Sequence, residues 1–122
     1  MLRAATGEVR RAVVEALVAE RDPRVVPMLV RILEESQPLG PDHDVVLETL
    51  EALGTVGTDA AIPALLTMAR RRKFFGGRKL RALKDRSVDT LARLGTAKSR
   101  EALKQAAAQG DGYLRKIAGA KL

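Results

Sequence analysis

The amino-acid sequence predicts an all-α protein built from stacked repeats. The first observation is a motif, Ala-Leu-Gly-Thr-Val-Gly-Thr at residues 52–58 followed by Ile-Pro-Ala-Leu at residues 62–65, with partners 36 residues upstream and 38 downstream. The second is that apolar residues recur at helical spacing, without the alternation of a strand. Because such a unit cannot bury its apolar face alone, neighbouring units must stack on it.

Seven apolar stripes, each spaced for one face of a helix, predict seven helices. The seventh stripe is short because the chain ends soon after it. In chain order the stripes cover residues 9–17, 25–33, 45–53, 62–69, 80–94, 103–107 and 113–118.

Residues at the boundaries of the stripes support this order. Asp22-Pro23 and Thr58-Asp59 are helix start signals, and Thr58 is a candidate N-cap. Gly40-Pro41 can open the third helix, with the proline in its first turn. Asp42 and Asp44 would then lie near the positive end of that helix.

Glycine and proline mark the ends and starts of several predicted helices. Gly57 and Gly95 fall just past helix ends, where a left-handed residue is expected. Pro27 and Pro63 lie at matching positions near the start of the second helix of each pair. There a proline loses little, because the N–H groups of the first turn have no helical partner.

The Ala-Leu-Gly-x-x-Gly-Thr…Ile-Pro-x-Leu pattern resembles the HEAT-repeat family, particularly the short bacterial HEAT-like repeats also found in phycobilin lyases. The match is strong at residues 52–65, good at 90–103 and weaker at 16–29, where Glu20 and Arg21 replace the usual apolar-Gly pair. The resemblance implies a right-handed α-solenoid, an armadillo/HEAT-like superhelix, of about three helix pairs plus a half repeat. It implies no single activity.

The 122 residues are expected to form one HEAT-like domain, residues 1–122, without room for a second core. The first helix begins almost at Met1, with no evident polar capping repeat before it, although the ends of a solenoid must be capped. We therefore expect either that the chain is a segment of a longer protein or that Val9, Val13 or Leu17 packs against another copy.

Charge is segregated along the chain. The net charge is +7, yet residues 32–69 carry seven carboxylates and no Lys or Arg, whereas residues 70–86 carry nine basic groups and one acid. Extra residues separate successive repeats at 36–40 and 73–78, and such insertions come out on one edge of a solenoid, where binding often occurs. Segregated charge attracts partners of opposite charge.

We define the basic turn as residues 70–81, which combine dense positive charge, the only two Phe residues and two glycines. Its candidate binding residues are Arg70, Arg71, Arg72, Lys73, Phe74, Phe75, Arg78, Lys79 and Arg81. Three interpretations stay open: a solvated turn, a nucleic-acid site with Phe stacked on unpaired bases, and a site for an acidic protein or an anionic membrane.

Among the binding interpretations, an acidic protein partner is preferred, because helical repeat arrays generally present helices to other proteins. The predicted function is a non-enzymatic interaction module, one domain of a bacterial scaffold or regulatory protein. Nucleic-acid binding through the same turn is the alternative. Membrane binding is least favoured, and self-association through the acidic residues 32–69 is a further option.

Catalysis and cofactors are not expected. The chain has no Cys and a single His, His43, so neither a thiolate site nor a His-based metal site can form within one chain. Gly76-Gly77 lacks the spacing of a phosphate-binding loop. No apolar stretch reaches membrane-spanning length and no signal peptide opens the chain, so the expected location is the cytoplasm.

Overall fold

The computed structural model describes residues 7–20, 23–72 and 77–122. Within these ranges all regular structure is helical, as the sequence predicts, and the seven predicted α-helices are present. In chain order they are α1 (Gly7–Glu20), the 3-10 helix η2 (Pro23–Val25), α2 (Val26–Glu35), α3 (His43–Val56), the 3-10 helix η3 (Asp59–Ala61), α4 (Ile62–Ala69), α5 (Gly77–Leu94), α6 (Ala97–Gln109) and α7 (Gly112–Gly119).

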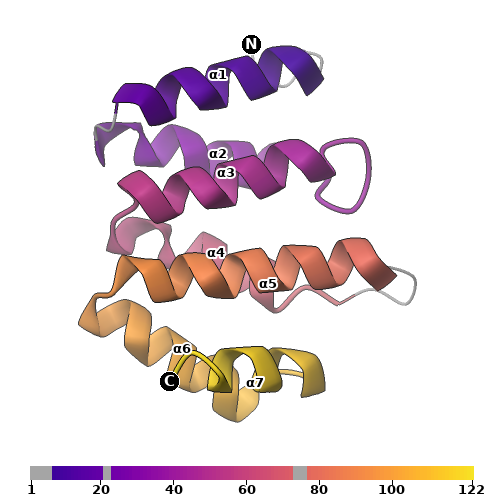
Figure 1. The fold of residues 1–122 in the computed structure, drawn as a ribbon, viewed down its shortest axis with the longest axis vertical. Helices are drawn as coiled ribbons and strands as arrows, with labels where there is room; N and C mark the ends of the chain where they lie inside the picture. Colours follow the sequence, from indigo (N-terminus) through magenta and orange to yellow (C-terminus); the bar gives the residue numbers. More distant parts are fainter. Residues whose placement is uncertain (1–6, 21–22, 73–76) are drawn as a thin grey trace.

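The helices form hairpins that stack into an α-solenoid (Figure 1). Helices α1, α3, α5 and α7 follow one another in one layer, with α1 packed on α3, α3 on α5 and α5 on α7. Helices α2, α4 and α6 make the second layer. The result is three helix pairs followed by a half repeat, as predicted.

The core is aliphatic, because the apolar stripe of each helix faces its neighbours. Leucines fill its centre in every repeat, each removed completely or almost completely from solvent. Full burial of such a side chain stabilises the fold by about 1.5–3 kcal/mol. The most buried leucines are Leu29, Leu33, Leu50, Leu53, Leu65, Leu83, Leu91 and Leu114.

Several predicted boundaries are confirmed. The Thr58 side chain accepts a hydrogen bond from the Ala60 N–H and caps η3. Pro27 and Pro63 lie in the first turns of α2 and α4. Gly95 adopts a left-handed conformation with φ of +64° after α5.

The left-handed conformation predicted for Gly57 is wrong, since its φ is −70°. Its N–H donates to the Leu53 carbonyl oxygen at 2.7 Å, so the chain returns closely to the end of α3. A Cβ atom at Gly57 would lie 2.0 Å from that oxygen. Glycine is required at position 57 because any side chain would clash with this carbonyl oxygen.

The predicted opening of the third helix at Gly40-Pro41 is also wrong, because α3 begins at His43. The carboxylate of Asp42 accepts a hydrogen bond from the Gln37 N–H at 2.9 Å. The Gly40 N–H donates to the Gln37 carbonyl oxygen, so this segment forms a turn and the helix starts after it.

The connections between repeats lie at one edge of the stack (Figure 1). The turn between α2 and α3, the end of α4, the start of α5 and the junction of α6 with α7 all occupy this edge. The first insertion, residues 36–40, lies at this edge as predicted, and residues 73–76 of the second insertion lie outside the described residues. The turns within repeats lie at the opposite edge.

Candidate functional site

The basic turn joins the end of α4 to the first turns of α5. The Arg70 N–H donates to the Leu66 carbonyl oxygen at 2.9 Å, where α4 ends. Six of the predicted binding residues are exposed, namely Arg70, Arg71, Arg72, Arg78, Lys79 and Arg81. The other three, Lys73, Phe74 and Phe75, lie outside the described residues, so their role in binding stays a prediction.

The exposed cations of the basic turn belong to different surfaces. Arg71 lines a recess of about 290 Å³ against residues 36–40, the turn between α2 and α3. Arg72 and Arg81 instead line a pocket of about 440 Å³ that also includes the start of α7. The fold therefore brings Arg72 and Arg81 together and places Arg71 against the preceding inserted turn.

Lys84 lies beneath this second pocket and is almost completely buried, with 3% of its side chain exposed. Its Nζ donates to the Ala69 carbonyl oxygen at 2.7 Å and to Asp111 Oδ2 at 2.8 Å. Asp111 Oδ1 in turn accepts from the Leu114 N–H and caps α7. One buried ammonium group thus connects the end of α4, the middle of α5 and the start of α7.

The pKa of Asp111 is lowered by its surroundings. Burial alone would raise it, but the hydrogen bonds from Lys84 and from the Leu114 N–H, with the positive charges of Lys84 and Arg72, favour the carboxylate more strongly. The interaction therefore stabilises the fold fully above the usual pKa of an Asp, and this contribution is lost as the pH falls through the lowered value.

Tyr113, at the start of α7, closes one side of the same pocket. Its hydroxyl donates to Asp85 Oδ1 at 2.7 Å, and the Arg81 guanidinium carbon lies 5.6 Å from the centre of its ring. The hydrogen bond to Asp85, partial burial and the Asp85 charge raise the pKa of Tyr113, while Arg81 opposes this shift. α7 is thereby tied to α5 at two places, by Lys84 and by Asp85.

Titration of Tyr113 gives a direct check, because it is the only tyrosine. We expect the phenolate absorbance of the folded protein to appear at higher pH than in the urea-unfolded chain. Asp85→Asn should move the midpoint down toward the unfolded value, and Arg81→Gln should move it further up. A midpoint that Asp85→Asn leaves unchanged would contradict the hydrogen bond. The Tyr113–Asp85 contribution to stability is present below the unfolded pKa of about 10 and lost above the folded one.

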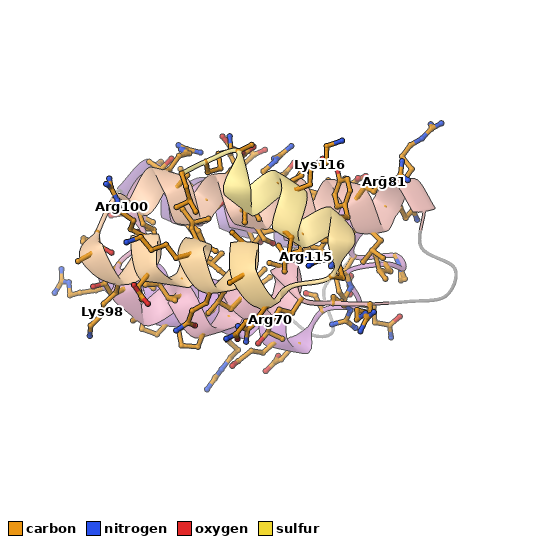
Figure 2. All side chains as sticks on the ribbon, turned by 90° about the horizontal axis from the view of Figure 1, so that it is seen from below. Arg70, Arg81, Lys98, Arg100, Arg115 and Lys116 are labelled. Atoms are coloured by element: carbon orange, nitrogen blue, oxygen red, sulfur yellow. The ribbon has the colours of Figure 1, made fainter. Side chains whose placement is uncertain are left out.

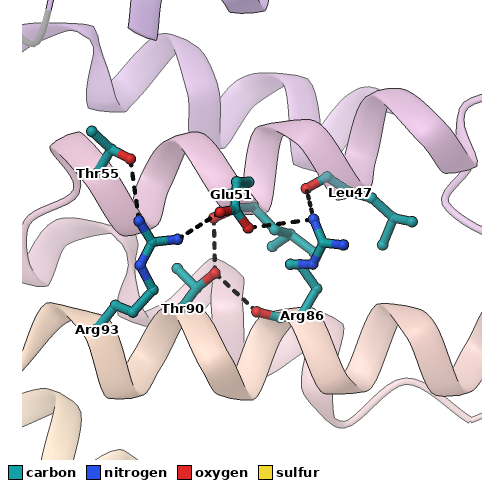
Figure 3. A network of polar contacts seen from close by, with 7 residues as sticks. Leu47, Glu51, Thr55, Arg86, Thr90 and Arg93 are labelled. Carbon is teal, nitrogen blue, oxygen red and sulfur yellow. Dashed lines mark hydrogen bonds and ion pairs between the residues drawn. The ribbon is translucent and has the colours of Figure 1, made fainter.

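Two arginines of α5, Arg86 and Arg93, are paired with an acid of α3 (Figure 3). Glu51 lies 3.4 Å from Arg86 Nη1 and 3.0 Å from Arg93 Nη1. These are exposed pairs, so each stabilises the fold by only about 0–1 kcal/mol. The two ion pairs also neutralise part of the positive charge that α5 would otherwise present at the surface.

Gly54 explains how Arg93 reaches Glu51. A Cβ atom at Gly54 would lie 2.7 Å from Arg93 Nη1. Glycine at this position therefore leaves the space in which the guanidinium group lies against α3. Arg93 Nη2 also donates to Thr55 Oγ1 at 3.3 Å (Figure 3).

Comparison with known families agrees with this architecture. The family model described as HEAT repeats matches residues 1–84. The chain belongs to the HEAT-repeat family. The match does not test the phycobilin-lyase type of repeat. Searches of curated proteins and of solved structures gave no match.

HEAT repeats are commonly protein-interaction modules and typically non-enzymatic scaffolds.

An acidic residue recurs at the equivalent position in the first helix of each HEAT repeat. These residues are Glu15, Glu51 and Asp89, spaced 36 and 38 residues apart. Asp89 pairs with Lys121 at 2.7 Å, as Glu51 pairs with Arg93. Both pairs join an acid on one repeat to a cation on the next.

Positive charge extends from the basic turn over the last HEAT helices. Figure 2 views the stack from its α6–α7 end and shows cationic side chains at several places around that end. Those of α6 and α7 are exposed. They are Lys98, Arg100, Lys104, Arg115 and Lys116.

Metal ligands, the single histidine and helix length can be stated for the described residues. In the described part of the chain, no three His, Cys, Asp or Glu residues are grouped so as to hold a metal ion. His43 Nδ1 lies 2.8 Å from the Pro38 carbonyl oxygen, and the residue is partly buried. Among the described helices, none has both the length and the apolar character needed to cross a membrane.

Sequence reasoning missed the cluster of Lys84, Asp111 and Tyr113. It counted Lys84 only as one of the nine basic groups and placed Tyr113 in an apolar stripe. A signal was available for Lys84, because it stands on the apolar face of α5, 38 residues after the fully buried Val46. Its partner Asp111 is 27 residues further along and has no sequence signal that would pair the two.

Proposed function

We propose that this HEAT-repeat chain is a non-enzymatic interaction module that binds an acidic protein surface through the basic turn. The observation that carries the proposal is the state of the cations there. The side chains of Arg70, Arg71, Arg78 and Lys79 are exposed, and none of them makes a hydrogen bond or an ion pair with a described residue. Arg86 and Arg93 of the same helix α5 are by contrast paired with Glu51.

Unpaired cations at one edge are suited to recruitment of an acidic partner. Clustered charge of one sign raises the rate of encounter with an oppositely charged surface, and the effect weakens with salt. The described cations lie at the end of α4 and in the first turns of α5, two helices that pack on each other through the aliphatic core. Arg71, beside residues 36–40, widens the proposed contact to the preceding inserted turn.

Affinity capture with two matched variants tests the proposal. The first carries Arg70→Glu, Arg71→Glu, Arg78→Glu and Lys79→Glu. The second reverses four exposed cations of the last helices, Lys98, Arg100, Lys104 and Arg115, and thus carries the same net charge. From a nuclease-treated lysate of the source organism, we expect the wild type and the second variant to retain the same acidic proteins, and the first variant to lose them.

Circular dichroism would confirm that both variants are helical before capture. Retention of the same proteins by the first variant, or equal loss from both variants, would reject the basic turn as the contact surface. General attraction to positive charge would cause the equal loss.

Nucleic-acid binding is the alternative function, and the cations around the α6–α7 end favour it (Figure 2). Fluorescence anisotropy with labelled single- and double-stranded DNA and RNA separates it from protein binding. Binding at physiological salt that disappears in the first variant would support the alternative, since phosphate contacts are strongly salt-dependent and indifferent to base sequence.

A further inference from the structure

We propose that the pocket lined by Arg72, the first turns of α5 and the start of α7 binds the phosphoryl group of a phosphorylated protein segment. This deepens the proposed function, on which it rests for the choice of a protein partner. The pocket has a volume of about 440 Å³ and opens beside Arg72, Arg81 and Tyr113. This space admits a phosphorylated side chain.

The charge of the pocket fits a dianion. Arg72, Arg81 and Lys84 line it together with one carboxylate, Asp111, so the net formal charge of the lining is +2. A phosphorylated Ser or Thr carries about −1.5 to −2 at neutral pH. A carboxylate side chain and a nucleic-acid phosphodiester each carry a single negative charge and would leave part of the positive charge uncompensated.

The two arginines are available to a ligand in a way that Lys84 is not. Two of the three Lys84 donors are used by Ala69 and Asp111. The Arg72 side chain makes no hydrogen bond or ion pair with a described residue, and the Arg81 guanidinium group lies over the Tyr113 ring without a hydrogen bond or ion pair to a described residue. Two guanidinium groups beside one pocket suit a phosphoryl group, because each can donate two parallel hydrogen bonds to its oxygens.

The wall contributed by α7 adds to this preference. Gly112 is the first residue of α7, and no atom lies within 4 Å of the place where its Cβ would be. Gly112 lines the pocket without a side chain at the positive end of the helix, where an anion is stabilised and where the Asp111 carboxylate already accepts the Leu114 N–H. Lys84 and Asp111 hold this end of α7 against α5, so the pocket wall is fixed before a ligand enters.

Tyr113 provides the test, because the chain has one tyrosine and no tryptophan. The probe is phosphoserine blocked by N-acetyl and C-terminal amide groups, and the comparators are dimethyl phosphate, blocked glutamate and inorganic phosphate. We expect the probe to change tyrosine fluorescence saturably. Dimethyl phosphate and blocked glutamate should bind about tenfold more weakly, because they carry one charge and form fewer charge-assisted hydrogen bonds.

Substitutions then locate the site. Arg72→Gln and Arg81→Gln should each weaken binding of the probe about tenfold, the effect of one lost charge-assisted contact. Lys98→Gln and Arg100→Gln each remove one positive charge from α6 without touching the pocket and should leave the affinity unchanged. Amide NMR shifts at Gly112 provide a second readout for Arg81→Gln, since Arg81 itself contacts the Tyr113 ring.

Each result decides the inference. It is overturned if the probe causes no change, if all four arginine and lysine variants weaken binding equally, or if dimethyl phosphate or blocked glutamate binds as tightly. Weaker binding of blocked phosphoserine than of inorganic phosphate would assign the pocket to a free anion and also overturn it. Capture of acidic proteins with no response at Tyr113 would reject this inference alone. A response at Tyr113 without capture would reject only the acidic-surface proposal.

Discussion

Substitution of Lys84 by methionine is expected to lower the free energy of unfolding by about 3 kcal/mol. Methionine fills a similar space but leaves the Asp111 carboxylate without its cation and the Ala69 carbonyl oxygen without its donor. Asp111 is mostly buried, with 18% of its side chain exposed, so water can replace the lost ammonium group only in part. Urea unfolding monitored by circular dichroism measures the difference.

The double variant Lys84→Met with Asp111→Asn is the control for this prediction. Asparagine keeps an oxygen for the Leu114 N–H and removes the unpaired charge, so we expect it to recover at least half of the loss. The deficit of the single variant should also shrink at low pH, where Asp111 becomes neutral. A single variant as stable as the wild type, or a double variant less stable than the single one, would contradict the role given to this pair.

Gly57→Ala is expected to cost about 2 kcal/mol, although alanine is ordinarily the better residue near a helix. The added Cβ would lie 2.0 Å from the Leu53 carbonyl oxygen and 3.0 Å from Leu94 Cδ2. The Gly57 N–H must then move away from that oxygen, which loses its hydrogen bond. Thermal and urea unfolding would both detect the loss.

Gly119→Ala is the matched control, because no atom lies within 4 Å of its added Cβ and the residue lies in α7. It should leave stability unchanged or raise it by up to about 1 kcal/mol. Equal effects of the two substitutions would show that Gly57 is not required by its close contact with Leu53.

The helices could be predicted because the residues of their apolar stripes are the residues that form the solenoid core. Leu50, Leu53 and Leu65 lie on stripes that can only be buried against neighbouring repeats, and all three are fully buried. Boundaries set by a single hydrogen bond could not be predicted. The start of α3 depends on the Asp42 carboxylate binding the Gln37 N–H, a contact that the Gly40-Pro41 signal does not reveal.

The same distinction holds for glycines. Gly57 and Gly95 both precede a threonine at a helix end, and the sequence predicts one conformation for both. Gly95 has φ of +64° and Gly57 has φ of −70°. The close return of Gly57 to Leu53 depends on how α3 meets η3, which the motif itself does not encode.

The candidate site was predictable in its charge and not in its geometry. The excess of cations at residues 70–86 is evident from the sequence. Which of them can meet a partner depends on distant residues, because Glu51 neutralises Arg86 and Asp111 neutralises Lys84. The role of Tyr113 likewise depends on Asp85, 28 residues earlier.

Site-specific photo-crosslinking tests the central claim, that the basic turn contacts a protein partner. A photoreactive phenylalanine replaces Lys79 in the basic turn or, as the control, the exposed Ala60 of η3. The connection between α3 and α4 that contains η3 lies at the edge of the stack opposite the start of α5 (Figure 1). Irradiation in a nuclease-treated lysate should give a discrete protein adduct from position 79 and none from position 60. No protein adduct at position 79, or the same adduct with equal yield at both positions, would contradict the claim.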